Sequence, residues 1–141
     1  GEDIKNPKDN LYNYFRNIIN AKADSIMWTT YKDNYENLKG RGFKLKHDRD
    51  KHHRIKPGCF TPWNLRATNA YRHKTSLAFC LNLFYNPFIT NYFKHYGITL
   101  DQDSYALSNM LQWIFRSTIR ENKPVDIYIP SLRMRNLLLN C

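Results

Sequence analysis

The sequence predicts an α/β fold, in which a mainly parallel sheet is covered by helices on both faces. Short apolar or β-favouring runs alternate with segments of helical periodicity, and this order is typical of parallel sheets. Hydrophobic residues make up 42% of the 141 residues, so the chain can bury one core. A polar lead-in is expected over residues 1–10, followed by a single domain over residues 11–141.

The N-terminal part of the domain is expected to contain two helices and a strand. Asp9 and Asn10 can cap a helix over residues 11–23, whose apolar side chains share one face. Residues 25–31 form a short, apolar and β-favouring run, which predicts a buried strand. A second helix is expected over residues 33–39, because an aspartate precedes it and a glycine follows it.

The later elements are inferred from residue types and from Gly and Pro at their ends. In chain order, we expect a short strand and an exposed loop within 39–56, a strand at 59–61, a loop at 64–69, a central strand or alternatively a helix within 76–84, a helix at 88–95, a helix at 101–121, a strand at 125–129 and a closing helix at 131–139. The helix over 101–121 is the clearest, because apolar residues from Leu107 to Phe115 recur at helical spacing.

The charge of the chain favours a polyanionic partner. Lys and Arg number 22 against 12 Asp and Glu, which gives a net charge of +10. Nucleic acid is the commonest such partner, and DNA is favoured over RNA here. The alternative is a basic protein whose charge only aids solubility, but the charge is concentrated within residues 39–56. The candidate nucleic-acid contacts in that segment are Lys44, Lys46, Arg49, Lys51 and Arg54.

The helix expected over residues 101–121 carries a polar stripe. Gln112, Arg116 and Arg120 recur every four residues, so they line one side of a regular helix. Two guanidinium groups on a rigid helix suit a phosphate site, because their forked donors match phosphate oxygens. The simpler interpretation is the solvated face of an amphipathic helix.

This stripe resembles motif VI of superfamily 2 helicases, Gln-x-x-Gly-Arg-x-x-Arg. Here Phe115 stands at the usual glycine, and the last arginine comes one residue late. The resemblance implies a RecA-like second motor domain in which Arg116 and Arg120 are catalytic and Gln112 contacts ATP. Such sequences occur in helicase-like proteins of bacterial mobile elements.

Other segments follow the order of the same family. Residues 25–39 resemble its first strand and helix, and the resemblance implies that Thr29, Thr30 and Lys32 hold backbone phosphates. Residues 64–69 resemble the motif V loop, which touches both the nucleic acid and the nucleotide site. The residues of this loop that the resemblance assigns to nucleic-acid binding are Arg66, Thr68 and Asn69.

The phosphate-binding loop of such motors is missing from this sequence. No Gly-x-x-x-x-Gly-Lys-Ser/Thr occurs, and no Asp-Glu pair follows a strand. In the family these features belong to the first RecA-like domain. The resemblance therefore implies a fragment or subunit, with ATP and Mg²⁺ bound mainly by a RecA-like ATPase domain in the same or another chain.

Two further hypotheses come from the residues themselves. One is a non-catalytic nucleic-acid-binding module whose footprint is the 39–56 segment, with Trp63 as the best candidate for stacking on a base. The other is a metal-dependent nuclease of the HNH type, which would use His52 or His53 with Asn64 and His73. No standard metal-ligand spacing is present, so no metal residues are assigned.

Membrane and compartment signals are few. The longest uncharged run, residues 75–92, is too polar for a membrane span, and no apolar signal-peptide region is visible at the N-terminus. The cysteines Cys59, Cys80 and Cys141 are scattered and odd in number, which argues against a disulfide framework. We therefore expect a cytoplasmic protein without a membrane partner.

Overall fold

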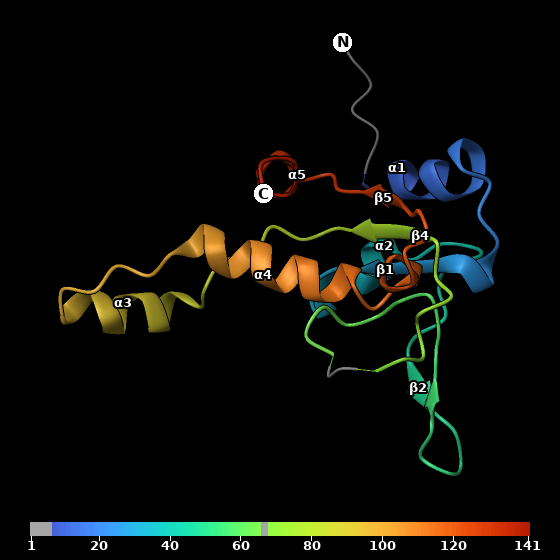
Figure 1. Ribbon diagram of the computed structural model, residues 1–141, viewed down its shortest axis with the longest axis horizontal. Helices are drawn as coiled ribbons and strands as arrows, with labels where there is room; N and C mark the ends of the chain where they lie inside the picture. The colour runs from blue at the N-terminus through green and yellow to red at the C-terminus, as the bar shows by residue number, and fades with distance from the viewer. Residues whose placement is uncertain (1–6, 66–67) are drawn as a thin grey trace.

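The computed structural model describes residues 7–65 and 68–141. Its elements in chain order are α1 (Pro7–Asn13), a π-helical turn η1 (Tyr14–Ile18), a 3-10 turn η2 (Ala23–Ser25), β1 (Ile26–Thr29), a 3-10 turn η3 (Lys32–Asn34), α2 (Tyr35–Leu38), β2 (Asp48–Arg49), β3 (Ile55–Lys56), β4 (Ser76–Phe79), α3 (Pro87–His95), α4 (Gln102–Ile114), a 3-10 turn η4 (Thr118–Glu121), β5 (Asp126–Tyr128) and α5 (Leu132–Leu139). Figure 1 shows their arrangement.

A parallel sheet lies at the centre of the fold. Its three strands are ordered β1-β4-β5, and β4 pairs with both neighbours in the parallel sense. Phe60 extends the sheet beyond β1 through a parallel bridge to Trp28, and Lys46 bridges to Phe60 in the same sense. The expected mainly parallel α/β sheet is therefore confirmed, with the run at 76–84 supplying its central strand.

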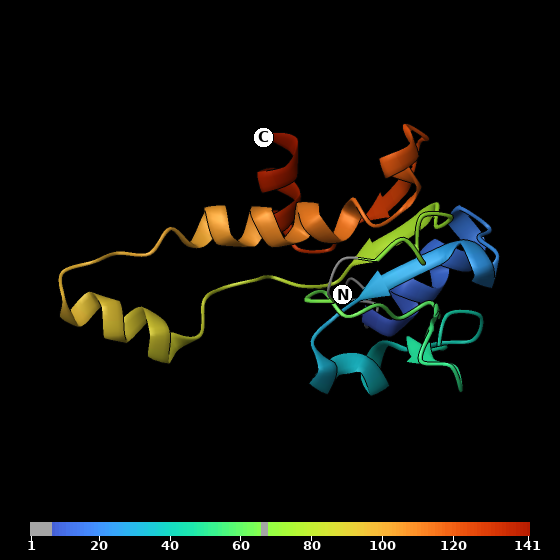
Figure 2. The same ribbon diagram turned by 60° about the horizontal axis from the view of Figure 1, so that its bottom comes forward.

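Both faces of the sheet are covered by helices. Successive side chains of each strand point to opposite faces, and each face packs into its own hydrophobic cluster. On one face, Met27 and Leu77 pack with buried residues of α4 and α5. On the other, Trp28 and Ala78 pack with buried residues of α1, the π-helical turn and α2. Figure 2 shows the two helical layers on either side of the strands.

The first helix begins earlier than the sequence indicates. It starts at Pro7, inside the stretch expected as a lead-in, and changes to a π-helical turn at Tyr14. Proline suits the first helical position, because the N–H that it lacks has no partner within a helix there. The backbone then reverses at Asn20, which has a positive φ of 47°, so the helix does not reach residue 23.

The helix expected over 101–121 ends at Ile114 instead. Asp101 caps its start as expected, by accepting a hydrogen bond from the Ser104 N–H. The end is set by Ser117, whose buried hydroxyl donates to the Ile114 carbonyl at 2.6 Å and accepts from the Ile119 N–H. This hydroxyl competes with the helical ladder, so a 3-10 turn follows in place of further α-helix.

Two segments project from this body, as Figures 1 and 2 show. The first is the antiparallel hairpin of β2 and β3, which we call the basic finger (residues 48–56). A single strand followed by a loop was expected there, so that expectation was wrong. The second is α3, which has no buried residue although Phe88 and Tyr92 are apolar. No helix in the described part of the chain is long and apolar enough to cross a membrane.

Candidate functional site

The carboxyl ends of the parallel strands meet at one edge of the sheet. After β1 the chain moves to the Phe60 side of the sheet, and it returns to place β4 on the other side of β1. In open parallel sheets, ligands bind outside the carboxyl ends of the strands at such a reversal of strand order. A ligand is therefore expected in the space beside Thr30 and Cys80, which follow β1 and β4.

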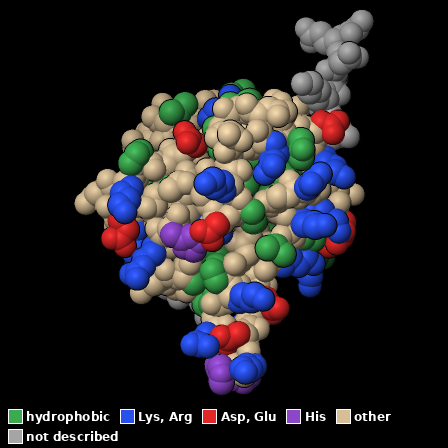
Figure 3. Space-filling view, turned by 90° about the vertical axis from the view of Figure 1, so that its right-hand side faces the viewer, with side chains coloured by type: hydrophobic (Ala, Val, Ile, Leu, Met, Phe, Trp, Pro, Cys, Tyr) green, Lys and Arg blue, Asp and Glu red, His purple; other side chains and the backbone are tan. Residues whose placement is uncertain are grey.

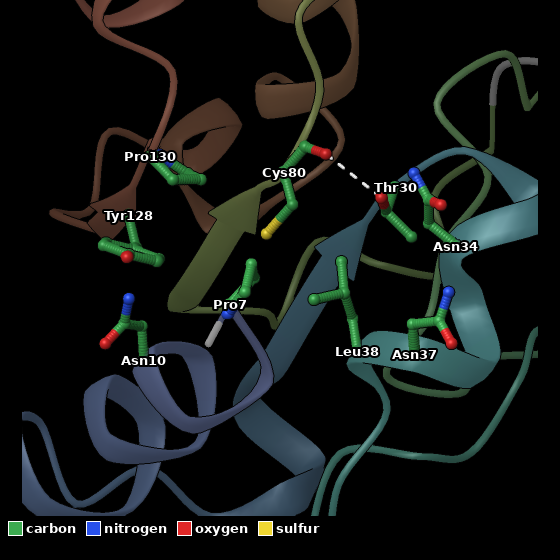
Figure 4. A pocket seen from close by; sticks show the side chains of 9 residues that line it. All are labelled: Pro7, Asn10, Thr30, Asn34, Asn37, Leu38, Cys80, Tyr128 and Pro130. Atoms are coloured by element: carbon green, nitrogen blue, oxygen red, sulfur yellow. Dashed lines mark hydrogen bonds between the residues drawn. The ribbon is translucent and has the colours of Figure 1, made fainter. Parts of the chain in front are cut away.

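A cavity of about 450 Å³ lies there, and we call it the neutral pocket (Figure 4). Its wall consists of Pro7, Asn10, Thr30, Asn34, Asn37, Leu38, Cys80, Tyr128 and Pro130. None of these side chains is charged at neutral pH, since burial raises the pKa of the Cys80 thiol to about 12. The Thr30 hydroxyl donates to the Cys80 carbonyl at 3.1 Å and holds the two strand ends together.

A second cavity of about 410 Å³ shares Thr30 with the first, and we call it the basic pocket. Its wall consists of Thr30, Lys32, Tyr35, Lys46, His47, Phe60, Pro62, Trp63 and Asn64. The Lys46 ammonium lies 4.3 Å from the centre of the Tyr35 ring, a cation–π contact that orients the lysine. Lys32 and Lys46 are exposed, so both can reach an anion.

His47 is the titratable group of the basic pocket. Its Nδ1 lies 2.6 Å from the hydroxyl of the buried Tyr71, whose pKa burial raises to about 12. A protonated phenol donates to Nδ1 only while the imidazole is neutral. Burial lowers the pKa of His47 below its usual 6.5, and the nearby Arg49 lowers it further. The imidazole is therefore neutral at pH 7.

We expect Arg49→Gln to raise the pKa of His47, because it removes a nearby positive charge but leaves the burial unchanged. The pKa of His47 is lower in the folded protein than in the unfolded chain, where it is about 6.5. The unfolded chain therefore binds the proton more readily, and the free energy of unfolding should decrease as the pH falls below 6.5. An NMR titration of the imidazole measures the shift. Lys51→Gln is the control that should leave it unchanged, and an unchanged His47 pKa in Arg49→Gln contradicts the assignment.

The basic finger rises from the basic pocket, because β2 directly follows His47. Its turn is ordered by Asp50, whose carboxylate accepts from the backbone N–H groups of His52 and Arg54 and from the Arg54 side chain. Arg49 donates to the His53 carbonyl. These bonds leave Lys51 exposed at the tip, and Figure 3 shows Lys, Arg and His side chains on the projection together with acidic ones.

The residues near the end of β1 that were expected to hold phosphates differ in their exposure to solvent. Thr29 and Thr30 are 0% and 2% exposed, although Thr30 borders both cavities. The cause is that both threonines belong to the sheet's buried strand end, where Thr30 bonds to Cys80. Lys32 lies in the basic pocket, and Lys44 is exposed before the finger.

Helix α4 ends before Arg116 and Arg120, yet the three residues of the predicted polar stripe still lie around one cavity. Gln112, Arg116 and Arg120 line a shallow cavity of about 340 Å³ together with Thr68 and Phe115, and we call it the arginine hollow. Arg116 is half-buried and donates to the Leu65 carbonyl. Burial lowers the pKa of Arg116, and the nearby Arg120 adds to this. Two cations held close together favour an anion between them.

The arginine hollow does not lie at the carboxyl edge of the sheet. Thr118, between its two arginines, donates its N–H to the Lys74 carbonyl at 2.9 Å. Lys74 precedes β4, so this contact marks the amino end of the strand. Of the motif V-like loop, Arg66 lies outside the described residues, Thr68 joins the hollow and Asn69 is exposed.

The nuclease constellation does not form. The described residues contain no group of three or more His, Cys, Asp or Glu side chains that could hold a metal ion. His52 lies in the turn of the basic finger, whereas His73 lies 3.6 Å from Asp24, just before the strands begin. Among the described elements, the hairpin is followed by the strand β4 and not by the helix that an HNH site needs.

Sequence reasoning missed the neutral pocket altogether. Its carboxamides come from α1, from the turn after β1 and from α2. Asparagine in short helices and turns carries no signal of ligand binding, because it is common there for capping. The sequence therefore contained no signal that could have identified this pocket.

Comparison with known proteins shows one family. A family model described as the YonV C-terminal Rossmann-like domain matches residues 1–141. The SPbeta prophage-derived uncharacterized protein YonV of Bacillus subtilis (strain 168) is 40% identical over 136 residues, which cover 96% of this chain. The same match covers 30% of that relative, so this chain spans less than a third of its length. No solved structure shows a significant match.

Proposed function

The chain belongs to the family of YonV C-terminal Rossmann-like domains, and on this premise we propose that it is a nucleic-acid-binding domain. The observation that carries the proposal is the basic finger standing directly beside the basic pocket. The net charge of +10 supplies the long-range attraction that such binding needs.

The two parts of this surface have different roles. The exposed cations of the finger, Lys51 and Lys56 among them, neutralise backbone phosphates and fix the position of the strand. At the base of the finger, Trp63 is half-buried, so it can present part of its indole ring to an unpaired base. Stacking accepts any base, so we expect little sequence preference.

Fluorescence anisotropy with labelled oligonucleotides tests the proposal. We expect the 141-residue chain to bind single-stranded DNA, with an affinity that falls steeply between about 50 and 200 mM salt. Duplex DNA and single-stranded RNA of equal length show which nucleic acid is preferred, with DNA expected to bind more tightly. The proposal fails if no oligonucleotide binds at low salt, or if the affinity does not depend on salt.

A second candidate is the second motor domain of an ATP-dependent helicase. The observation that favours it is the arginine hollow, which gathers Gln112, Arg116 and Arg120 around one space. ATP and Mg²⁺ would be bound mainly by a separate RecA-like ATPase domain, with the two arginines contacting the γ-phosphate. The position of the hollow near the amino end of β4 weighs against this proposal.

ATPase assays decide the second candidate, using a longer natural protein that contains this domain. If the domain supplies an arginine finger, Arg116→Ala or Arg120→Ala lowers kcat by about 10³-fold or more, because the charge on the transferred phosphoryl group loses its partner. Arg72→Ala, an exposed arginine outside the hollow, is the matched control. ATPase activity that survives both substitutions removes this candidate.

A further inference from the structure

The neutral pocket has the lining of a site for an uncharged, hydrogen-bonding group. Its carboxamides belong to Asn10, Asn34 and Asn37, and Figure 4 shows them around the space in front of Cys80 and Tyr128. The side chains of Asn34 and Asn37 make no hydrogen bond to the rest of the described chain. Both amides are therefore available to a ligand.

Carboxamides match the edges of heterocyclic bases. Each offers two N–H donors and one carbonyl acceptor, the same pairing of donor and acceptor that adenine, guanine and cytosine present along their edges. Leu38, Tyr128 and Pro130 supply apolar surface for the flat faces of a ring. A cavity of about 450 Å³ lies within the range of small-ligand sites.

The basic pocket lies next to this site, because Thr30 borders both cavities. Both cavities include Thr30 in their walls, and Lys32 and Lys46 line the second one. The first wall offers carboxamides to an uncharged ring and the second offers ammonium groups to an anion. A nucleotide has this chemistry, with its base and its phosphate separated by a sugar.

We propose that the neutral pocket holds the base of a nucleotide whose phosphate lies in the basic pocket. The inference rests on the proposed function, and it adds a phosphate contact at Lys32 and Lys46 and a base site separate from the one at Trp63. The nucleotide is either free or part of a bound strand, and both present the same base and phosphate. A strand would place one base in the neutral pocket, with neighbouring phosphates along the finger.

NMR titrations of the 141-residue chain with the four nucleoside 5′-monophosphates and with ribose 5-phosphate test the base site. We expect at least one nucleotide to bind about tenfold more tightly than ribose 5-phosphate, because the sugar phosphate lacks the base that would bond to the amides and pack on Leu38. Signals of Asn37 and Tyr128 should shift with that nucleotide and not with ribose 5-phosphate. In the double variant Asn34→Ala/Asn37→Ala, the nucleotide should bind no better than ribose 5-phosphate.

Two controls separate the base site from changes in folding. Asn34 and Asn37 are exposed, so the double variant should keep its melting temperature and its affinity for ribose 5-phosphate. Asn91→Ala, on the projecting helix α3, should leave both affinities unchanged. A nucleotide preference that persists in the double variant overturns the proposal.

Oligonucleotides distinguish the two sources of the base. If the nucleotide belongs to a strand, an oligonucleotide with a central abasic site binds about tenfold more weakly than the intact one, and the double variant removes this difference. If it is free, the nucleotide preference appears and the abasic site has no effect. Equal binding in both comparisons overturns the base site, whereas salt-dependent oligonucleotide binding would still support the proposed function.

Discussion

Replacing Lys51 and Lys56 with alanine is expected to weaken oligonucleotide binding about thirtyfold. Both lysines are exposed on the basic finger, so each can neutralise one phosphate without disturbing the fold. A contact contributes on the order of 1 kcal/mol, and two such losses correspond to this factor. The slope of log affinity against log salt should also fall by about 1.4 to 1.8, because two fewer counterions are released per complex. Anisotropy titrations at several salt concentrations measure both quantities.

The matched control removes the same charge elsewhere. Lys94 lies on α3 and Lys123 lies near the amino ends of the strands, and both are exposed. Lys94→Ala/Lys123→Ala should leave the salt slope unchanged, and the affinity should fall only slightly through the lower net charge. If the two double variants weaken binding equally, the finger has no special role and binding is diffuse attraction to a basic protein.

The fold could be predicted from local patterns because they agree with tertiary packing here. The run at 76–84 is apolar on both sides, and such a strand is stable only where helices cover both faces of a sheet. Of the predicted apolar stripe from Leu107 to Phe115, Met110 and Ile114 are buried in α4, whereas Phe115 is 53% exposed and the buried Trp113 was not part of the stripe. At Ser117 packing overrides the local preference for helix, so the predicted helix is longer than α4, which ends at Ile114.

The candidate site was less accessible to prediction, because it depends on which segments meet in space. The sequence indicated Lys32, Lys46 and Trp63 separately, yet it gave no reason to place them around one pocket. They meet because residues 46 and 60 add to the sheet edge beside β1. The neutral pocket depends in the same way on α1 and α2 approaching the ends of the strands.

Removing the indole of Trp113 is expected to cost about 3 to 5 kcal/mol of unfolding free energy, as for other fully buried tryptophans. Trp113 is 0% exposed, and its ring meets Phe79 of the central strand edge-on, with 5.4 Å between the ring centres. A domain of this size has only about 5 to 15 kcal/mol of total stability. We therefore expect Trp113→Ala to lie close to the unfolding threshold, as measured by urea denaturation.

Two further substitutions show what the indole contributes. Trp113→Phe keeps most of the ring but leaves the Thr61 carbonyl, 3.1 Å from the indole nitrogen, without this donor, at a cost of about 1 to 3 kcal/mol. Phe115→Ala removes an aromatic ring that is 53% exposed, so its effect should be much smaller. Because Thr61 leads into the loop that carries Trp63, Trp113→Phe should also weaken oligonucleotide binding at temperatures where the variant is folded. If Trp113→Ala costs no more than Phe115→Ala, then α4 does not cover the sheet as described.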